Sequence, residues 1–219
     1  MTAALVVSLV ARTLTRNRVW ADNLVLDKSM IQADPSNSSA HMNLGITYSN
    51  LGRLQAGEEE LRESIRLDPS NRRAHFNLAA LYIEQNRLLE AAEANEAAVR
   101  IAPTYAKARS SLGVIYTKLG RYEAAMRELR EAVRLDPDMA EGHNNLGMLY
   151  GDLGRLDEAL AEFQMAARLG SNLAATHFNL GLAHMKLGHF DQARRAFGRA
   201  AELDPRYEKW AADSAGPRR

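Results

Sequence analysis

The stretch SSAHMNLGITYSNLGRLQAGEEELRESIRLDPSN, residues 38–71, decides the fold, because most of the remaining chain repeats it. Shifting the sequence by 34 residues aligns this stretch without a gap with windows that begin at Arg72, Ala106, Ala140 and Ala174. A fixed period of this length indicates an array of stacked structural units rather than one globular core. We therefore number the positions of each window from 1 to 34 and compare the windows column by column.

Several columns keep one kind of residue in all five windows. Column 7 is always leucine, column 8 is always small, and column 11 is tyrosine until the last window, where it is histidine. Column 24 is mostly large and apolar, and column 32 is mostly proline. Three- and four-residue spacings place these columns on shared helix faces. Column 8 holds Gly45, Ala79, Gly113, Gly147 and Gly181, and column 24 holds Leu61, Asn95, Leu129, Phe163 and Phe197.

This pattern of Leu-Gly, Tyr, Ala, Phe and Pro over 34 residues resembles the tetratricopeptide repeat. The resemblance implies an all-α fold, an α-solenoid in which helix pairs stack into a right-handed superhelix and the first helices line a concave groove. Asn95 departs from the apolar column 24 and predicts looser packing in its window. Ser171 replaces the column 32 proline, and Gly170 is expected to end the helix there instead. The windows that match are 38–71, 72–105, 106–139, 140–173 and 174–207.

Each window is expected to form two helices. In the first window these run from about Ser39 to Leu51, ending at Gly52, and from about Leu54 to Leu67, ending before Pro69. The acidic run 58–60 is expected in the first turn of the second helix, where carboxylates are favoured. Residues 208–219 form a short C-terminal cap and tail: RYEKWAAD, 206–213, is predicted as a truncated first helix with Tyr207 and Trp210 on the preceding helix, and 214–219 as disordered.

Residues 1–37 leave two interpretations open. Their apolar run AALVVSLV, 3–10, is far shorter than the roughly 20 residues that span a bilayer and lacks the flanks of a signal peptide. Residues 4–37 could form a degenerate repeat, in which case the chain is expected in the cytoplasm. Alternatively, the run ends a truncated membrane helix and associates the chain with a membrane. The join RTLTRNRVWADN is similar to that of bacterial membrane proteins with a multi-spanning, glycosyltransferase-like half before such repeats. Both interpretations predict a helix over 20–33.

Composition and motifs argue against several functions. The net charge of +1, with both signs interspersed, gives no reason to expect a nucleic-acid partner. Cysteine is absent, and no phosphate-binding glycine loop, GxSxG, HExxH or carboxylate pair is present, so we expect neither an enzyme nor a cofactor. Four histidines share column 4, but packed helices lie about 8–10 Å apart, too far for one metal ion to bridge. We therefore expect His41, His75, His143 and His177 to be packing residues and no metal site.

Column 6 is the strongest candidate for a binding site. It lies beside the Leu-Gly-Tyr face and should point into the groove, where side-chain amides offer a donor and an acceptor to the backbone of an extended peptide. The column is similar to the asparagine ladder of the O-GlcNAc transferase repeats, except at its serine. The alternative is that asparagine here only supports the local fold. The candidate peptide-binding residues are Asn43, Asn77, Ser111, Asn145 and Asn179.

Neighbouring columns supply further groove candidates. Met42, Phe76 and Phe178 in column 5 would offer adaptable apolar contacts to peptide side chains. Arg73 and Lys107 in column 2 would make the groove mildly basic, unless they belong to a solvated surface of mixed charge. A complete clamp for a chaperone carboxylate is not expected, because serines stand where two of its bases belong.

Two functions are consistent with these features. The first is a non-catalytic scaffold that binds an extended peptide of a partner protein in the concave groove. The second is the substrate-recruiting arm of a membrane-bound glycosyltransferase-like protein, attached through the N-terminal segment. Self-association through the ends of the array is compatible with both.

Overall fold

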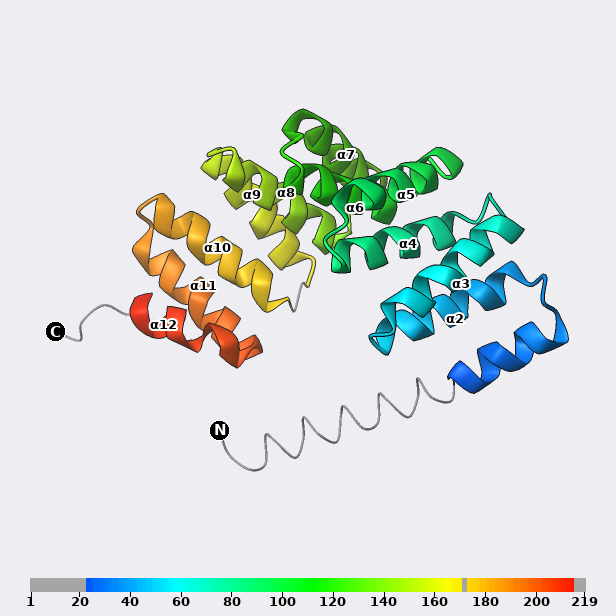
Figure 1. The fold of residues 1–219 in the computed structure, drawn as a ribbon. Helices are drawn as coiled ribbons and strands as arrows, with labels where there is room; N and C mark the ends of the chain where they lie inside the picture. The colour runs from blue at the N-terminus through cyan, green and yellow to red at the C-terminus, as the bar shows by residue number, and fades with distance from the viewer. Residues whose placement is uncertain (1–22, 171–172, 215–219) are drawn as a thin grey trace, which may run out of the picture. The chain divides into compact units, whose positions relative to one another are not determined.

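A computed structural model describes residues 23–170 and 173–214, and these residues are helical apart from short connections. Residues 23–33 form a helix, while 20–22, also predicted helical, lie outside the described residues. The helices that follow are α2 (Ser38–Asn50), α3 (Leu54–Leu67), α4 (Arg72–Glu84), α5 (Leu88–Ile101), α6 (Ala106–Lys118), α7 (Tyr122–Leu135), α8 (Ala140–Asp152), α9 (Leu156–Arg168), α10 (Ala174–Lys186), α11 (Phe190–Leu203), the 3₁₀ turn η1 (Pro205–Tyr207) and α12 (Glu208–Ser214), as Figure 1 shows.

The helices end where the sequence predicts. Gly52 follows α2 with φ +73°, and Asn86 fills the equivalent position with φ +59°, a left-handed conformation that asparagine tolerates better than most residues. Gly170 has φ +79° and ends α9, as expected from the missing proline. At the other end, the side chains of Asn37 and Asn71 accept hydrogen bonds from backbone amides in the first turns of α2 and α4. Such caps typically contribute about 1 kcal/mol.

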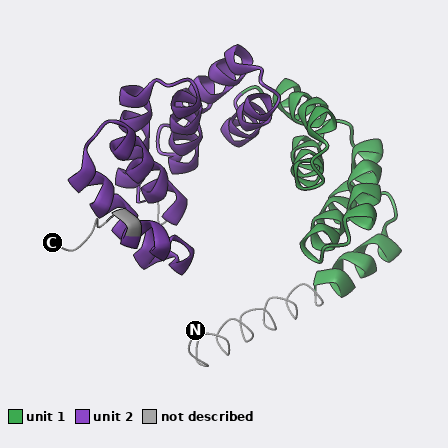
Figure 2. Cartoon of the chain, turned by 60° about the vertical axis from the view of Figure 1, so that its left-hand side comes forward, with its two compact units in different colours: residues 1–103 green, residues 104–219 purple. Residues whose placement is uncertain are grey.

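The chain divides into two compact units, residues 1–103 and 104–219, coloured green and purple in Figure 2. In unit 1, α2 packs on α3, α4 packs on α5, and α3 also packs on α4. In unit 2 the pairs are α6 with α7, α8 with α9 and α10 with α11, and α7 contacts α8 as α9 contacts α10. Within each unit, consecutive helix pairs therefore stack in the manner of an α-solenoid.

Small residues in column 8 let the two helices of a pair approach closely. A Cβ atom built on Gly45 would lie 2.7 Å from Leu61 Cγ, and one built on Gly147 would lie 2.7 Å from Phe163 Cε1. Both partners belong to column 24 and are almost completely buried. In unit 2 the packing grows into one apolar cluster, whose buried members are Ala125, Leu129, Leu146, Leu149, Tyr150, Ala159, Phe163 and Ala183.

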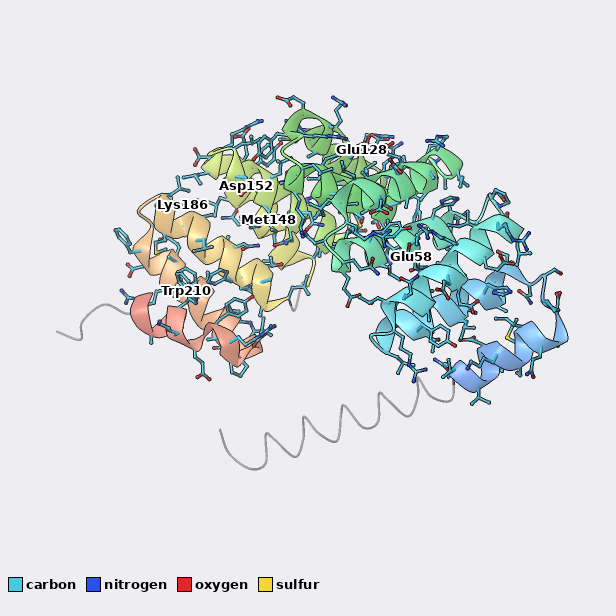
Figure 3. All side chains as sticks on the ribbon, in the orientation of Figure 1. Glu58, Glu128, Met148, Asp152, Lys186 and Trp210 are labelled. Carbon is cyan, nitrogen blue, oxygen red and sulfur yellow. The ribbon has the colours of Figure 1, made fainter. Side chains whose placement is uncertain are left out.

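The C-terminal segment caps the last helix pair. The Tyr207 ring lies 4.8 Å from the Phe178 ring, and Trp210 on α12 lies 5.2 Å from Phe178 and 6.3 Å from Phe197 between centroids (Figure 3). Trp210 thus lies on α11, as predicted, and on α10 as well, whereas the Tyr207 ring lies on Phe178 of α10. Ser214 belongs to α12 rather than to a disordered tail, and 215–219 lie outside the described residues.

At the N-terminal end, Asp27 would occupy column 24 if residues 4–37 are numbered as a degenerate repeat. It is 5% exposed and accepts a hydrogen bond of 2.9 Å from the Thr47 hydroxyl. Burial raises the pKa of Asp27, and the bond from Thr47 only partly offsets this effect. The apolar run 3–10, on which the two interpretations of the N-terminus depend, lies outside the described residues. None of the described helices combines the length and the hydropathy that crossing a membrane requires.

Candidate functional site

The asparagines of column 6 in unit 2 are tied to the preceding repeat. Asn145 Nδ2 donates a hydrogen bond of 3.1 Å to Ser110 Oγ, and Asn179 Nδ2 donates one of 3.3 Å to Asn144 Oδ1. Both acceptors lie in column 5 of the repeat before. These asparagines therefore help to join successive repeats. However, no hydrogen bond within the described chain uses the Oδ1 atom of Asn145 or Asn179, so each keeps a free acceptor.

In unit 1 the same column is arranged differently. Asn77 Nδ2 donates a hydrogen bond of 2.8 Å to the Arg73 carbonyl, one turn back on its own helix. The column 5 residue of the preceding repeat is Met42, which offers no oxygen acceptor. Asn77 Oδ1 also has no partner in the described chain, and Asn43 forms no side-chain hydrogen bond there. Asn43, Asn77 and Ser111 are all half-buried.

A pocket of about 160 Å³ in unit 2 contains one of the predicted asparagines. Asn179, Leu182 and Lys186 of α10 form one wall, and α8 forms the opposite wall. The floor is apolar because α9 supplies Leu156, Ala159 and Phe163. Figure 3 shows Met148 and Asp152 on α8 and Lys186 on α10. No ion pair joins Asp152 to Lys186 within the described chain, so the pocket is apolar at its base and carries both charges at its rim.

Unit 1 has a pocket of about 300 Å³ made from the same columns. Asn77, Ala80 and Glu84 of α4 correspond in column to Asn179, Leu182 and Lys186, and Leu61 lies in the column of Phe163. The opposite wall comes from α2 and consists of Ile46, Ser49 and Asn50. This pocket is more polar than its counterpart, and its charged residue is an acid. The two units therefore carry one kind of pocket with different lining chemistry.

Other predicted groove residues lie in different surroundings. Met42 is only 3% exposed, and Phe178 belongs to the aromatic cluster of the C-terminal cap, so both contribute to packing. Phe76 is half-buried. Arg73 in unit 1 and Lys107 in unit 2 are exposed and form no ion pair within the described chain, and neither lines the two pockets.

The candidate binding residues did not include columns 9 and 13, which supply most of the pocket walls. A signal was available, because columns 6, 9 and 13 are spaced i, i+3 and i+7 and so form one stripe along a first helix. Met148, in column 9, is 47% exposed and lies at the open edge of its pocket. The stripe on α8 consists of Asn145, Met148 and Asp152.

Two of the column 4 histidines bond to the second helix of their own pair. His41 Nδ1 lies 2.7 Å from Glu60 and His143 Nδ1 lies 2.6 Å from Glu162, while Nε2 of each faces a proline carbonyl. Arg109 pairs with Glu128 in the same way, at 2.6 Å. In the part of the chain that the structure describes, no three or more His, Cys, Asp or Glu side chains come together as a metal site.

The acidic run 58–60 departs from its expected place, because α3 begins at Leu54 and its first turn contains no acid. Glu60 instead pairs with His41 across the helix pair. Glu58 is 2% exposed and forms ion pairs with Arg62 at 2.9 Å and with Arg87 at 2.6 Å. Burial alone would raise the pKa of Glu58, but the hydrogen bond from Arg87 and the two positive charges outweigh burial and lower it.

Comparison with solved structures gives matches at 20–24% identity, which show the fold. YrrB, described as a TPR protein with an unusual peptide-binding site, matches at 22% identity and a TM-score of 0.62, over 82% of this chain and 92% of that one. A thermophilic TPR protein of Thermus thermophilus matches at 23% identity and a TM-score of 0.69, over 81% and 98%. The APC/C hetero-tetramer Cut9-Hcn1 gives 20% identity and a TM-score of 0.80, over 89% of this chain but only 39% of that chain.

Family comparison agrees with the column pattern. No curated protein matches the sequence significantly. Models of the TPR repeat and the tetratricopeptide repeat match residues 42–106, 113–154, 149–188 and 174–207, which together cover most of the chain. With its 34-residue period and its stacked helix pairs, the chain belongs to the tetratricopeptide repeat family.

Proposed function

We propose that this chain is a protein-interaction scaffold whose two units each bind an extended segment of a partner protein along the stripe of columns 6, 9 and 13. The repeat fold itself supports a scaffold with protein partners, and proteins of this family are generally non-catalytic. The observation that carries the finer proposal is the recurrence of one pocket, with an asparagine in its wall, in both units. YrrB, a protein of the same fold, is described as having a peptide-binding site.

The hydrogen bonds within the chain suggest how the asparagines would act. Asn77, Asn145 and Asn179 each use one amide N–H as a donor within the chain and keep the Oδ1 atom as an acceptor. A backbone N–H of an extended peptide is the complementary donor. The pocket in each unit would then take one peptide side chain. An apolar side chain suits unit 2, where Phe163 and Leu182 line the floor and wall, and a basic one suits unit 1, where Glu84 stands at the rim.

A peptide-display selection on the full chain, followed by affinity measurements, tests this proposal. The selected peptide is titrated into the wild type and into a variant with Asn43, Asn77, Asn145 and Asn179 all replaced by Ala. Each lost hydrogen bond is worth about 0.5–1.5 kcal/mol, so we expect the affinity to fall at least roughly tenfold. Replacing Asn179 by Asp, which keeps an acceptor, should preserve most of the affinity.

The matched control replaces four exposed residues of the second helices, Glu59, Glu93, Arg127 and Arg195, by Ala. Circular dichroism and thermal melting check that each variant stays folded. Equal affinity of the wild type and the four-asparagine variant would refute the proposed role of column 6. Met148→Glu and Leu182→Glu place a charge in the wall of the unit 2 pocket. If the selected peptides bind these variants with unchanged affinity, the binding site does not include that pocket.

A further inference from the structure

Unit 1 contains a complete binding site for a carboxylate, occupied by its own Glu58. Arg87 Nη1 and Nη2 donate to the two carboxylate oxygens at 2.6 and 3.2 Å, and the Tyr82 hydroxyl donates at 3.2 Å. Arg62 completes the site with an ion pair of 2.9 Å and also donates a hydrogen bond of 3.0 Å to the Tyr82 hydroxyl. Glu58 is labelled in Figure 3. The site thus consists of two guanidinium groups and one phenol arranged around one carboxylate.

Unit 2 repeats these three partners two windows further along the chain. Arg130 corresponds to Arg62, Tyr150 to Tyr82 and Arg155 to Arg87. Arg130 Nη2 donates a hydrogen bond of 3.1 Å to the Tyr150 hydroxyl, close to the 3.0 Å of the Arg62 bond in unit 1. The guanidinium carbon of Arg155 lies 4.6 Å from the Tyr150 ring centroid, against 4.2 Å for Arg87 and Tyr82. The two units therefore bring the same three receiving groups together, although Arg130 donates to the Tyr150 hydroxyl from Nε as well, at 3.3 Å.

The carboxylate itself is missing from unit 2. Its position in the register is taken by Met126, which packs against the apolar cluster and cannot accept a charged hydrogen bond. Arg155 keeps an ion pair with Glu158, as Arg87 does with Glu90, but its Nη1 atom has no partner in the described chain. Arg130 is exposed and forms no ion pair there, but its charge, like that of Arg155, lowers the pKa of Glu158. Two guanidinium groups thus converge on one phenol without the anion that they hold in unit 1.

We infer that Arg130, Tyr150 and Arg155 receive a carboxylate from an acidic side chain of a protein partner. Charge complementarity selects the ligand, and the Glu58 carboxylate in unit 1 shows which group fits. Arginine suits this role because its planar guanidinium group bonds a carboxylate at two points. The site is separate from the column 6 stripe: Tyr150 follows Asn145 by five residues, which places the two side chains about 140° apart around α8. The proposed carboxylate site therefore does not depend on peptide binding by the column 6 stripe.

The test uses the full chain and two peptide probes of equal length, the charged acetyl-Glu-Glu-Glu-amide and the uncharged acetyl-Gln-Gln-Gln-amide. The Nε–Hε resonances of Arg130 and Arg155 are followed by NMR during each titration. We expect the glutamate peptide alone to shift both resonances and to saturate them. Arg62 and Arg87 serve as internal controls, because their carboxylate is already present and their resonances should stay in place.

Two variants separate the site from a general charge effect. Met126→Glu should rebuild the unit 1 arrangement and fill the site with a carboxylate of the chain itself. The affinity for the glutamate peptide should then fall at least about tenfold, the equivalent of losing one charged hydrogen bond. Arg130→Gln, an exposed change, should weaken it similarly without disturbing the fold. The four-asparagine variant should respond like the wild type. An equal response to both peptides, no saturation, or a response unaffected by Met126→Glu and Arg130→Gln would overturn the inference.

Discussion

The two units share one repeat but join their successive helix pairs by different chemistry. In unit 1 the buried carboxylate of Glu58 on α3 is held by Arg87, which precedes α5 in the next pair. In unit 2 the equivalent residue is Met126, and the pairs meet through an apolar cluster that contains Leu129 and Leu149. The comparison teaches that the columns of the repeat fix the helix pair, whereas the contact between pairs accepts either a polar or an apolar solution.

The residues of column 24, which lie inside the helix pairs, also differ between the units in being polar or apolar. Phe163 in unit 2 is 4% exposed and fills the space left by Gly147, whereas Asn95 in unit 1 is completely buried. Within the described chain neither polar atom of the Asn95 side chain has a hydrogen-bond partner. Ala79 stands opposite in column 8, where the other windows have glycine. A Cβ at Gly45 would approach Leu61 Cγ to 2.7 Å, so alanine in this column leaves too little room for leucine.

The largest effect that we expect comes from truncating the two column 24 residues. Phe163→Ala should lower the free energy of unfolding by about 3–5 kcal/mol, because it removes a buried ring and leaves a cavity. Asn95→Ala should change it far less, since the lost packing is offset by removal of two unsatisfied polar atoms. Urea unfolding, with hydrogen exchange to locate the change, measures both. Similar losses for the two variants would show that column 24 plays one role in both units.

The second effect concerns the contact between helix pairs. Arg87→Met leaves Glu58 buried with fewer partners and should cost about 1.5–3 kcal/mol, typical of a hydrogen bond to a charged group. The matched change in unit 2, Arg155→Met, removes a partly exposed pair with Glu158 and should cost less than about 1 kcal/mol. The urea midpoint of each variant is compared with that of the wild type. Equal decreases for the two variants would contradict the role of the Glu58–Arg87 ion pair in joining the helix pairs of unit 1.

The third effect is a coupling between columns 8 and 24. Asn95→Leu should stabilise unit 1 more in the Ala79→Gly background than in the wild type, because glycine provides the room that the leucine needs. A double-mutant cycle should give a favourable coupling of about 0.5–3 kcal/mol, the range for residues in contact. Additive effects of the two substitutions would mean that Ala79 does not restrict its neighbour.

The smallest effect is a pH dependence in unit 2. His184 replaces the column 11 tyrosine, is 8% exposed and has its Nδ1 3.4 Å from His189 Nδ1. Burial lowers the pKa of His184, and the charges of His189 and Arg195 lower it further. Below the unfolded value of about 6.5 the unfolded chain therefore binds a proton more readily than the folded chain. Above about pH 6.5 His184 is neutral in both states and does not reduce the free energy of unfolding. As the pH falls from this value through the lowered pKa of the folded chain, the unfolded chain is protonated first and the free energy of unfolding decreases.

His184→Tyr, the residue of the other windows, should flatten this decline. Urea midpoints at pH 7.5 and 5.5 for the wild type and the variant provide the test, and the remaining histidines serve as a common background. If the two proteins lose stability equally between these conditions, the protonation of His184 does not contribute.

The 34-residue period allowed the helices, their order and their ends to be predicted from the sequence, because each is encoded several times. Gly52 and Asn86 end first helices in the predicted left-handed conformation, and Trp210 covers the last pair. The joints between pairs could not be predicted in the same way. Glu58 looks like any acid near a helix start, and only its burial beside Arg87, 29 residues away, shows its role.

The candidate site was only partly predictable. Column 6 was found because four of its five members are asparagine, but whether an amide bonds to its own chain depends on a neighbour one repeat away. Asn145 has Ser110 as a partner, whereas Asn77 follows a repeat with Met42 in that place. Neighbouring columns 5 and 6 lie about 100° apart around the first helix. A modest rotation of that helix about its axis therefore decides which column faces a groove and which is buried. For this reason Met42 could not be separated from Asn43 by pattern alone.

The aromatic cluster at the end of unit 2 covers a repeat face that a second molecule could otherwise contact. Tyr207 and Trp210 lie on Phe178 and Phe197, the rings that would otherwise receive the first helix of another repeat. A head-to-tail contact through an open repeat face could propagate without closing and yield a filament. Because α12 occupies that face, a second molecule would have to peel it away before docking there. The seven residues of α12, with Tyr207 before them, therefore cover aromatic rings that would otherwise be open to a neighbouring molecule.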